Sequence, residues 1–358
     1  MKAAVLYCIF NRLDVVKETF QSIREYKPPK LYIASDGPRE GKEGEFELVQ
    51  SVRNYVLEHI DWDCKVNTLF RDKNLGCRNQ MIGAIRWFFD NEPMGIIIED
   101  DIKASPQFFD FCNILLDKYK DNKKVLNIHG TRLSNIEYKY DYSFCHESEI
   151  WGWASWADRF NDVDFSLSDW KQFRDEKRLD KILNNEFAVK FWSSVFNYWY
   201  NSNTNSSWAV SLLFDNFKKG EHGCVSIAPA SKNLVTNIGY DGVHFSKDCA
   251  GELGWEIDYL DTSNLRHPNS LETDKELLDR YYENLCSKEA NKVYSRCKHT
   301  RFVYYLLQYL KLASTFLKLV ITPKSNNVLY KRRFTRLVLI RDNITLAKYY
   351  YDALEKNK

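Results

Sequence analysis

The sequence lacks the cysteine spacing of a zinc site or of a disulfide framework. Its nine cysteines are an odd number, and no two of them form a Cys-x-x-Cys pair. Paired spacings are typical of structural zinc sites and of small secreted domains. We therefore expect buried thiols in a reducing compartment.

Long apolar segments are also missing. No stretch of about 20 residues is both uncharged and apolar throughout, so we expect no membrane-spanning helix. The apolar run at the N-terminus is too short for a signal peptide, and Asn11-Arg12 interrupts it early. These features predict a cytoplasmic protein.

Three phosphate-binding signatures are absent. No Gly-x-Gly-x-x-Gly follows the first apolar run, which disfavours a dinucleotide-binding Rossmann domain, and no Gly-x-x-x-x-Gly-Lys-Ser/Thr indicates a P-loop. A nucleotidyltransferase that makes nucleotide sugars is disfavoured because no Gly-rich loop with Arg or Lys follows that run. The net charge is only +2, so no nucleic-acid partner is expected.

The pattern that is present alternates strands and helices. Apolar runs at 3–10, 30–35, 64–70 and 96–98 predict strands, and amphipathic patterns between them predict helices, with Asp14 able to cap the first. Further helices are expected at 106–119, 187–200 and 208–219. This alternation predicts an α/β fold with a doubly wound, mostly parallel sheet.

The fourth apolar run leads directly into three acids, Glu99, Asp100 and Asp101. Three carboxylates in a core would each cost several kcal/mol or more, so the strand should end here, at the carboxyl edge where open α/β sheets bind ligands. Strand alternation would aim Glu99 and Asp101 to one side and Asp100 to the other. Such oxygens suit Mg²⁺ or Mn²⁺ bridged to a diphosphate. An acidic turn is the alternative interpretation.

Polar residues also follow the other strands, and the carboxyl ends of parallel strands share one edge. They are Asn11-Arg12, Asp36 with Arg39, and the segment from Arg71 to Gly76. Arg39, Arg71 and Arg78 could meet phosphates there, or could be ordinary solvated surface side chains.

A tryptophan-rich segment, Trp151-Gly152-Trp153-Ala154-Ser155-Trp156, suits neither a plain helix nor a plain strand. It could form an aromatic platform for a sugar ring or a plug in the core, since tryptophan serves both uses.

Together these strings resemble a bacterial GT-A-type, family-2-like nucleotide-diphospho-sugar glycosyltransferase, and are distantly similar to the N-acetylglucosaminyltransferase I group. The resemblance covers about residues 1–250 and includes the string 233–239. It implies a Rossmann-like GT-A domain at 1–268, with a nucleotide-sugar half (1–130) and an acceptor half (131–268). Residues 269–358 would be a helical, basic extension.

The resemblance also implies roles for individual residues. Asp101 and His244 would hold Mn²⁺ or Mg²⁺, Glu99 and Asp100 would contact ribose and donor sugar, and Arg12 and Asp36 would grip a uracil base. The rest of the nucleotide-sugar site would be Asn11, Arg39, Arg71, Asn74, Gly76 and Arg78. Rings for stacking acceptor or sugar would be Trp151, Trp153 and Trp208.

One position departs from the family pattern. Ala209 stands where relatives often carry an Asp similar in position to a catalytic base, whereas an inverting transferase needs a base near the acceptor hydroxyl. The nearby candidates are Asp215, Asp241, Glu147 and Glu149. A binding or scaffold protein that has lost its chemistry is therefore the alternative function.

The C-terminal segment has a charge of its own. Residues 301–358 hold 12 Lys and Arg against 3 Asp and Glu, a net charge of +9, while the remainder of the chain has a net charge of −7. A basic amphipathic segment beside Lys331-Arg332-Arg333 suits the anionic inner face of a membrane, whereas the alternative is a helical cap with a solvated basic face. We expect a lipid-linked oligosaccharide or surface glycan as acceptor.

Overall fold

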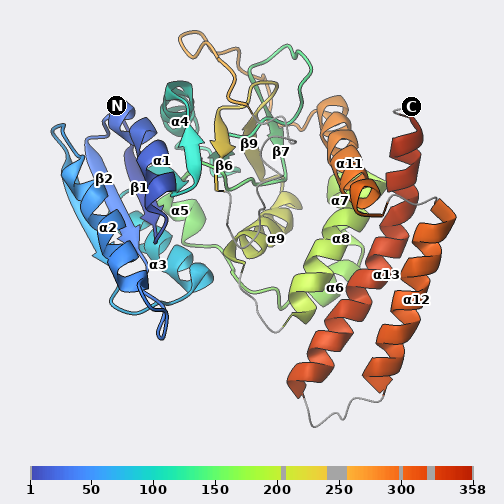
Figure 1. Ribbon diagram of the computed structural model, residues 1–358. Coiled ribbons are helices and arrows are strands. Elements are labelled where there is room, and N and C mark those ends of the chain that lie inside the picture. Colours follow the sequence, from blue (N-terminus) through green and yellow to red (C-terminus); the bar gives the residue numbers. More distant parts are fainter. Residues whose placement is uncertain (1, 203–206, 240–255, 298–300, 321–326, 357–358) are drawn as a thin grey trace. The chain divides into compact units, whose positions relative to one another are not determined.

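The computed structural model describes residues 2–202, 207–239, 256–297, 301–320 and 327–356 (Figure 1). The chain forms two compact units. Residues 1–164 and 222–274 make up the first, here called the sheet unit, and residues 165–221 and 275–358 make up the second, the helical unit. The domain boundary expected at residue 268 lies near the boundary at 274. Segment 165–221 was expected in the first domain, whereas the structure places it in the helical unit.

The sheet unit contains an eight-stranded sheet in the order β3-β2-β1-β4-β8-β6-β9-β7. Its strands are β1 (Ala4–Ile9), β2 (Lys30–Ser35), β3 (Lys65–Phe70), β4 (Met94–Glu99), β6 (Val125–His129), β7 (Tyr142–Cys145), β8 (Trp153–Trp156) and β9 (Val225–Pro229). Strands β3, β2, β1 and β4 pair in parallel, as do β6 and β9, and the remaining pairs are antiparallel. A separate antiparallel pair joins β5 (Ile102–Ala104) to β10 (Val235–Asn237).

Helices cover both faces of this sheet. They are α1 (Leu13–Tyr26), α2 (Glu45–Glu58), α3 (Cys77–Phe89), α4 (Pro106–Tyr119) and α5 (Ala157–Phe160). Helix α1 contacts α2 and α4 on one face, whereas α3 contacts α5 on the other (Figure 1). Alternate residues of β1, Val5, Tyr7 and Ile9, pack into the core shared with α1 and α4, as strand periodicity requires. The predicted class, a mostly parallel sheet flanked by helices, is confirmed.

Two local predictions need correction. Asp14 does not cap α1, because the helix begins at Leu13 with Arg12 as its N-cap residue, and Asp14 lies in the first turn. Strand β4 is longer than the three isoleucines and runs from Met94 to Glu99.

The helical unit packs a second core, rich in aromatic rings. Its helices are α6 (Trp170–Asp175), α7 (Arg178–Leu183), α8 (Glu186–Asn201), α9 (Trp208–Gly220), α11 (Lys275–Cys297), α12 (Arg301–Val320) and α13 (Asn327–Lys356). Trp170, Phe196 and Phe214 are fully buried in this core. Asn197 of α8 accepts from the indole of Trp170 at 3.0 Å and donates to Asp342 of α13 at 3.1 Å, which ties α13 to the core.

Two findings concern expectations about cysteines and membranes. The seven cysteines whose side chains the structure describes are free thiols. In the part of the chain that the structure describes, no helix has both the length and the apolarity needed to cross a bilayer.

Candidate functional site

The candidate site lies where the strand order of the sheet reverses. The chain passes from β1 to β2 and β3 on one side, and β4 then pairs with β1 on the other. Open α/β sheets bind ligands in the crevice at the carboxyl ends of such neighbouring strands. Arg12 follows β1 and the acids Asp100 and Asp101 follow β4, so these side chains lie at the switch point.

Arg12 joins the two acids. Its Nη2 bonds to Oδ1 of Asp100 and lies 3.1 Å from Oδ2 of Asp101. Strand alternation predicted that these carboxylates would point to opposite sides, which is wrong because the chain turns at Asp100 and both side chains face Arg12. The backbone of Asp100 is fixed as well, since the Thr19 hydroxyl donates to its carbonyl oxygen at 2.8 Å.

Burial sets the charge of this cluster. Desolvation raises the pKa of Glu99, and repulsion from the neighbouring carboxylates of Asp101 and Asp100 raises it further. Desolvation also raises the pKa of Asp100, although the cation of Arg12 opposes the shift. Both shifts show that burial and mutual repulsion disfavour the negative charges, so a cation bound beside these carboxylates would stabilise their ionised forms.

The carboxylates fit a divalent metal that is shared with a substrate. Within the described residues, no three His, Cys, Asp or Glu side chains are grouped to hold a metal by themselves. Mg²⁺ is commonly bound through one or two carboxylates together with substrate phosphates, so Asp100 and Asp101 would be sufficient protein ligands. Oδ2 of Asp100 is buried and has no hydrogen-bond partner among the described residues, as expected of an oxygen awaiting a ligand.

A short segment after β10 packs against Asp101. The backbone N–H of Ile238 donates to the carbonyl oxygen of Asp101 at 2.8 Å. A Cβ added at Gly239 would lie 2.6 Å from Oδ2 of Asp101 and 2.9 Å from Nη1 of Arg12, so only glycine fits there without displacement. The expected metal ligand His244 lies outside the described residues, as does Asp241.

Asp36 organises the neighbouring loop. Its carboxylate is 5% exposed and accepts from the backbone N–H groups of Gly37, Leu75 and Gly76 at 2.9, 2.9 and 3.1 Å. Asn74 supports the same loop by donating to the carbonyl oxygen of Gly37 at 2.8 Å. Residues 36–37 and 72–76, which were expected to line the nucleotide, are thus held together by Asp36 itself.

Glu45 joins two of the expected site residues, and the sequence did not predict this role. It begins α2, is 4% exposed, and accepts from Nδ2 of Asn11 at 3.0 Å and from Nε of Arg39 at 3.0 Å. Hydrogen bonds from Arg39 lower the pKa of Glu45. The structure therefore brings Asn11 and Arg39 together through this carboxylate, and an acid following Gly44 at a helix start was the available signal.

The other two arginines that were expected to bind phosphate lie in or beside α3. Nε of Arg71 is buried without a hydrogen-bond partner among the described residues, and a Cβ on Gly83 of α3 would lie 3.5 Å from its Nη2. Arg78 lies in the first turn of α3. Arg53, another residue that was not expected, donates to the carbonyl oxygens of Asp36 and Arg71 at 3.0 and 2.8 Å and so braces both loops.

Two of the three expected stacking tryptophans lie in the core. Trp153 and Trp208 are 1% and 2% exposed, so no sugar ring can reach their faces in this structure. The core-plug alternative applies to Trp153, which packs against Phe160 with ring centroids 6.0 Å apart. Trp151 is half-buried at the edge of the core of the sheet unit.

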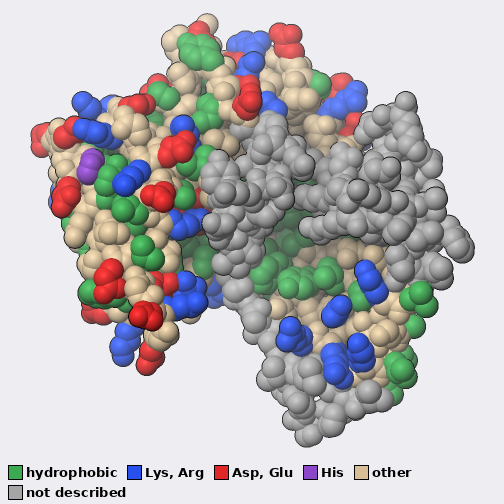
Figure 2. All heavy atoms as spheres, viewed as in Figure 1, with side chains coloured by type: hydrophobic (Ala, Val, Ile, Leu, Met, Phe, Trp, Pro, Cys, Tyr) green, Lys and Arg blue, Asp and Glu red, His purple; other side chains and the backbone are tan. Residues whose placement is uncertain are grey.

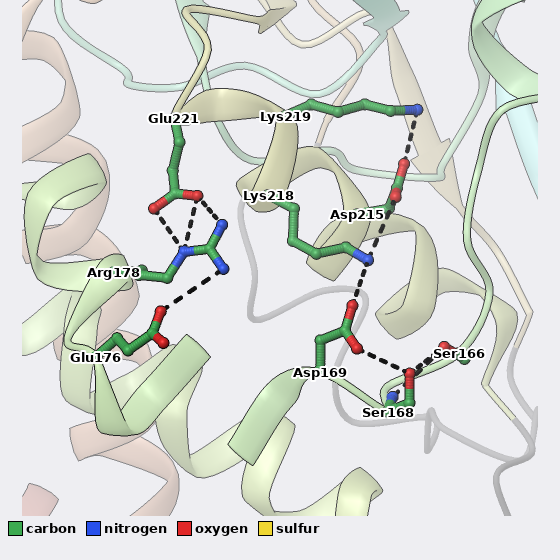
Figure 3. Close-up of polar contacts among 9 residues, drawn as sticks. All are labelled: Ser166, Ser168, Asp169, Glu176, Arg178, Asp215, Lys218, Lys219 and Glu221. Carbon is green, nitrogen blue, oxygen red and sulfur yellow. Dashed lines mark hydrogen bonds and ion pairs between the residues drawn. The ribbon is translucent and has the colours of Figure 1, made fainter. Parts of the chain in front are cut away.

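The candidates for a catalytic base fall in different places. Glu147 and Glu149 follow β7 in the sheet unit, and desolvation raises the pKa of the buried Glu147 to about 7. Asp215 lies on α9 in the helical unit, where Nζ of Lys219 is 2.8 Å and Nζ of Lys218 is 3.9 Å from its carboxylate (Figure 3). Lys218 also lies 3.6 Å from Asp169, so the two lysines balance the charges of both aspartates.

Comparisons with known proteins were made for sequence and for structure. No protein-family model matches the sequence, and no curated protein matches it. Among solved structures, the chain is similar to residues 1–349 of TarS from S. aureus, at 10% identity and a TM-score of 0.40, with 98% of this chain and 92% of that chain covered.

Two further solved structures are similar to the chain. The mannosyltransferase PcManGT from Pyrobaculum calidifontis, in complex with GDP-Man and Mn²⁺, has 9% identity and a TM-score of 0.37, with 97% and 86% covered. UDP-glucose pyrophosphorylase complexed with UDP-glucose has 10% identity and a TM-score of 0.35, with 66% and 93% covered. Both of these structures contain a nucleotide sugar, GDP-Man in the first and UDP-glucose in the second.

Proposed function

We propose that this protein is a metal-dependent glycosyltransferase that moves a sugar from a nucleotide donor, a UDP-sugar, to a hydroxyl group. The observation that carries the proposal is the group formed by Arg12, Asp100 and Asp101 at the switch point of the sheet. A diphosphate with a divalent cation matches this group in charge, because the cation can meet the carboxylates while the phosphate oxygens meet arginine.

The roles follow from the contacts in the sheet unit. Asp101, with Asp100 beside it, would hold Mn²⁺ or Mg²⁺, which when bound supplies positive charge that stabilises a leaving diphosphate. The loops at 36–39 and 71–76 would bind the nucleotide, since Asp36 shapes them and Arg71 has an unused donor. Glu99 would contact the donor sugar from the end of β4.

The general base is proposed to be Glu147 or Glu149. Both belong to the sheet unit, as do the acids, and Glu149 is the more accessible of the two, because Glu147 is only 1% exposed. Removal of the acceptor proton on the face opposite the leaving diphosphate would give inversion. Glu147→Gln and Glu149→Gln should each be assayed, and unchanged turnover in both would exclude this assignment.

The acceptor is proposed to be a growing surface glycan or a glycolipid, with the protein peripheral at the inner face of the cell membrane. The support is the basic C-terminal segment, which has nine Lys and Arg and no acid between residues 301 and 341. Such a segment would hold the enzyme where lipid-linked acceptors are found.

The test is donor binding measured as thermal stabilisation. UDP- and GDP-sugars are added with and without Mn²⁺ to the wild type, to Asp101→Asn and to Asp110→Asn, an exposed acid of α4 that serves as control. A ligand at about 100 times its Kd stabilises a fold by about 2.7 kcal/mol. We expect one donor with Mn²⁺ to give this shift in the wild type and the control but not in Asp101→Asn.

A non-catalytic binding or scaffold protein is the second candidate, favoured by Ala209 in the first turn of α9. Sugar release from the donor in the presence of Mn²⁺ and an acceptor extract separates the two functions. Donor binding without release would support the scaffold, and no stabilisation by any nucleotide sugar would contradict both.

A further inference from the structure

Helix α12 of the helical unit exposes an apolar face. Tyr309, Leu310, Phe316, Leu317 and Val320 are 54–64% exposed. On its opposite side the same helix buries Thr315 and Leu319. The helix thus has one face packed in the unit and a second apolar face left open, which is unusual for a soluble surface helix.

The exposed residues form one continuous stripe. Positions 309, 313, 316 and 320 recur at the helical spacing, and 310 and 317 lie directly beside them. At 1.5 Å per residue the stripe is about 17 Å long. Scattered surface leucines need no explanation, but an ordered stripe of large apolar side chains indicates an interaction surface.

Basic side chains border this stripe. Lys311 and Lys318 of α12 are exposed beyond one edge of the stripe, about 100° around the helix from Leu310 and Leu317. Lys331, Arg332 and Arg336 of α13 are exposed as well. Arg333 donates to the carbonyl oxygen of Lys318 at 2.6 Å, which places the start of α13 beside the end of α12. Figure 2 shows Lys and Arg side chains gathered where Figure 1 draws α6 and the lower part of α13, and apolar side chains along the edge where it draws α12.

The positive charge of residues 301–341 indicates which kind of partner this apolar stripe would bind. A second copy of the chain would bring two such basic faces together, and residues 301–341 contain no Asp or Glu that could compensate them. An anionic lipid bilayer offers both an apolar layer for the stripe and a negative surface for the lysines and arginines.

We propose that this face, named the α12 face and made of Tyr309, Leu310, Ala313, Phe316, Leu317 and Val320, lies in the interface of an anionic membrane. The stripe enters the boundary between headgroups and acyl chains, and Lys311, Lys318 and the basic residues of α13 meet lipid phosphates. This extends the proposed membrane location to particular residues, but it does not depend on sugar transfer.

The test is sedimentation of the full-length protein with vesicles, without donor or metal, so that a failure is distinct from a failure of the glycosyltransferase proposal. The vesicles are phosphatidylcholine with and without about one-third phosphatidylglycerol, at low and high salt. One variant carries Phe316→Ser and Leu317→Ser, and its control carries Phe46→Ser and Leu48→Ser on the exposed side of α2. A second carries Lys311→Gln and Lys318→Gln, and its control carries Lys17→Gln and Lys65→Gln, two exposed lysines of the sheet unit.

We expect partition into anionic vesicles only, weakened by high salt. Each of the two α12 lysines that is removed should lower the partition about five-fold, and the serine pair should abolish it, while both controls bind as the wild type does. Circular dichroism and the melting temperature establish that each variant is folded. Equal binding by the α12 variants and their controls, or a dimer in light scattering that the serine pair dissociates without any vesicle binding, would overturn the proposal.

Discussion

Nη2 of Arg12 lies 3.1 Å from Oδ2 of Asp101, and the same nitrogen bonds to Asp100. This guanidinium therefore supplies the positive charge that two adjacent carboxylates require at the carboxyl edge of the sheet. Asp100 is 5% exposed, so the pair is largely removed from water. A charge that loses its counter-ion in such a place is costly.

Arg12→Met should therefore lower the free energy of unfolding by about 3 kcal/mol, because it leaves Asp100 buried without a counter-charge. The change is measured by denaturant unfolding monitored by tryptophan fluorescence. The matched control is Arg24→Met, which breaks the solvent-exposed pair with Asp61 and should have a far smaller effect. Equal losses in the two variants would show that Arg12 has no special role at the site.

Gly37→Ala should destabilise the loop that Asp36 organises. The added Cβ would lie 2.5–2.7 Å from backbone atoms of Asp72 and Lys73, which cannot move independently of that loop. We expect a loss of about 1–3 kcal/mol, typical of overpacking, together with weaker donor binding. The control is Gly83→Ala in α3, where the nearest contact is an ordinary 3.5 Å, so stability should stay equal or rise by up to about 1 kcal/mol.

The buried His129 should give the protein an acid-sensitive stability. Desolvation lowers its pKa to about 4, whereas an unfolded histidine titrates near 6.5. As the pH falls below about 6.5, the unfolded chain takes up a proton that the folded protein refuses until about pH 4, so stability is lost across this window. The full difference is about 3 kcal/mol.

This loss is measured as the free energy of unfolding at pH 7 and at pH 4 for the wild type and for His129→Leu. The difference between the two proteins isolates the histidine, because Glu147, whose pKa is raised to about 7, titrates in both. Parallel profiles would contradict the prediction.

Asp215→Asn should leave turnover within about two-fold of the wild type and lower stability by about 1 kcal/mol. The carboxylate is paired with Lys219 at 2.8 Å and with Lys218 at 3.9 Å, so it acts as a structural counter-charge on α9 (Figure 3). Turnover is measured as release of nucleotide from the donor. A loss of 100-fold or more, with an unchanged melting temperature, would instead identify Asp215 as the base.

Much of the fold was predictable because it depends on local periodicity. The bounds of α4 at Pro106–Tyr119 and of β2 at Lys30–Ser35 agree with the sequence patterns. Each has apolar residues at one spacing, followed by polar or helix-breaking residues. Asp14 was misassigned because two neighbouring positions can both begin a helix, and local sequence does not decide between them.

The site was predictable only in outline. Polar residues at strand ends had to converge, but the sequence did not reveal that Glu45 joins Asn11 to Arg39, or that Trp153 is buried. Those outcomes depend on which helix packs over which strand. The residues next to an aromatic ring or a carboxylate in the sequence do not show whether that side chain lies in the core or on the surface.

By itself the sequence determined the order of strands and helices, the acids after β4 and the basic charge of the C-terminal segment, since each is a property of residues close together in the chain. Only the tertiary structure decided that Arg12 meets Asp100 across a separation of 88 residues, and that segment 165–221 joins the C-terminal helices. Such long-range pairings arise from the burial of whole apolar faces, which no short stretch of sequence specifies.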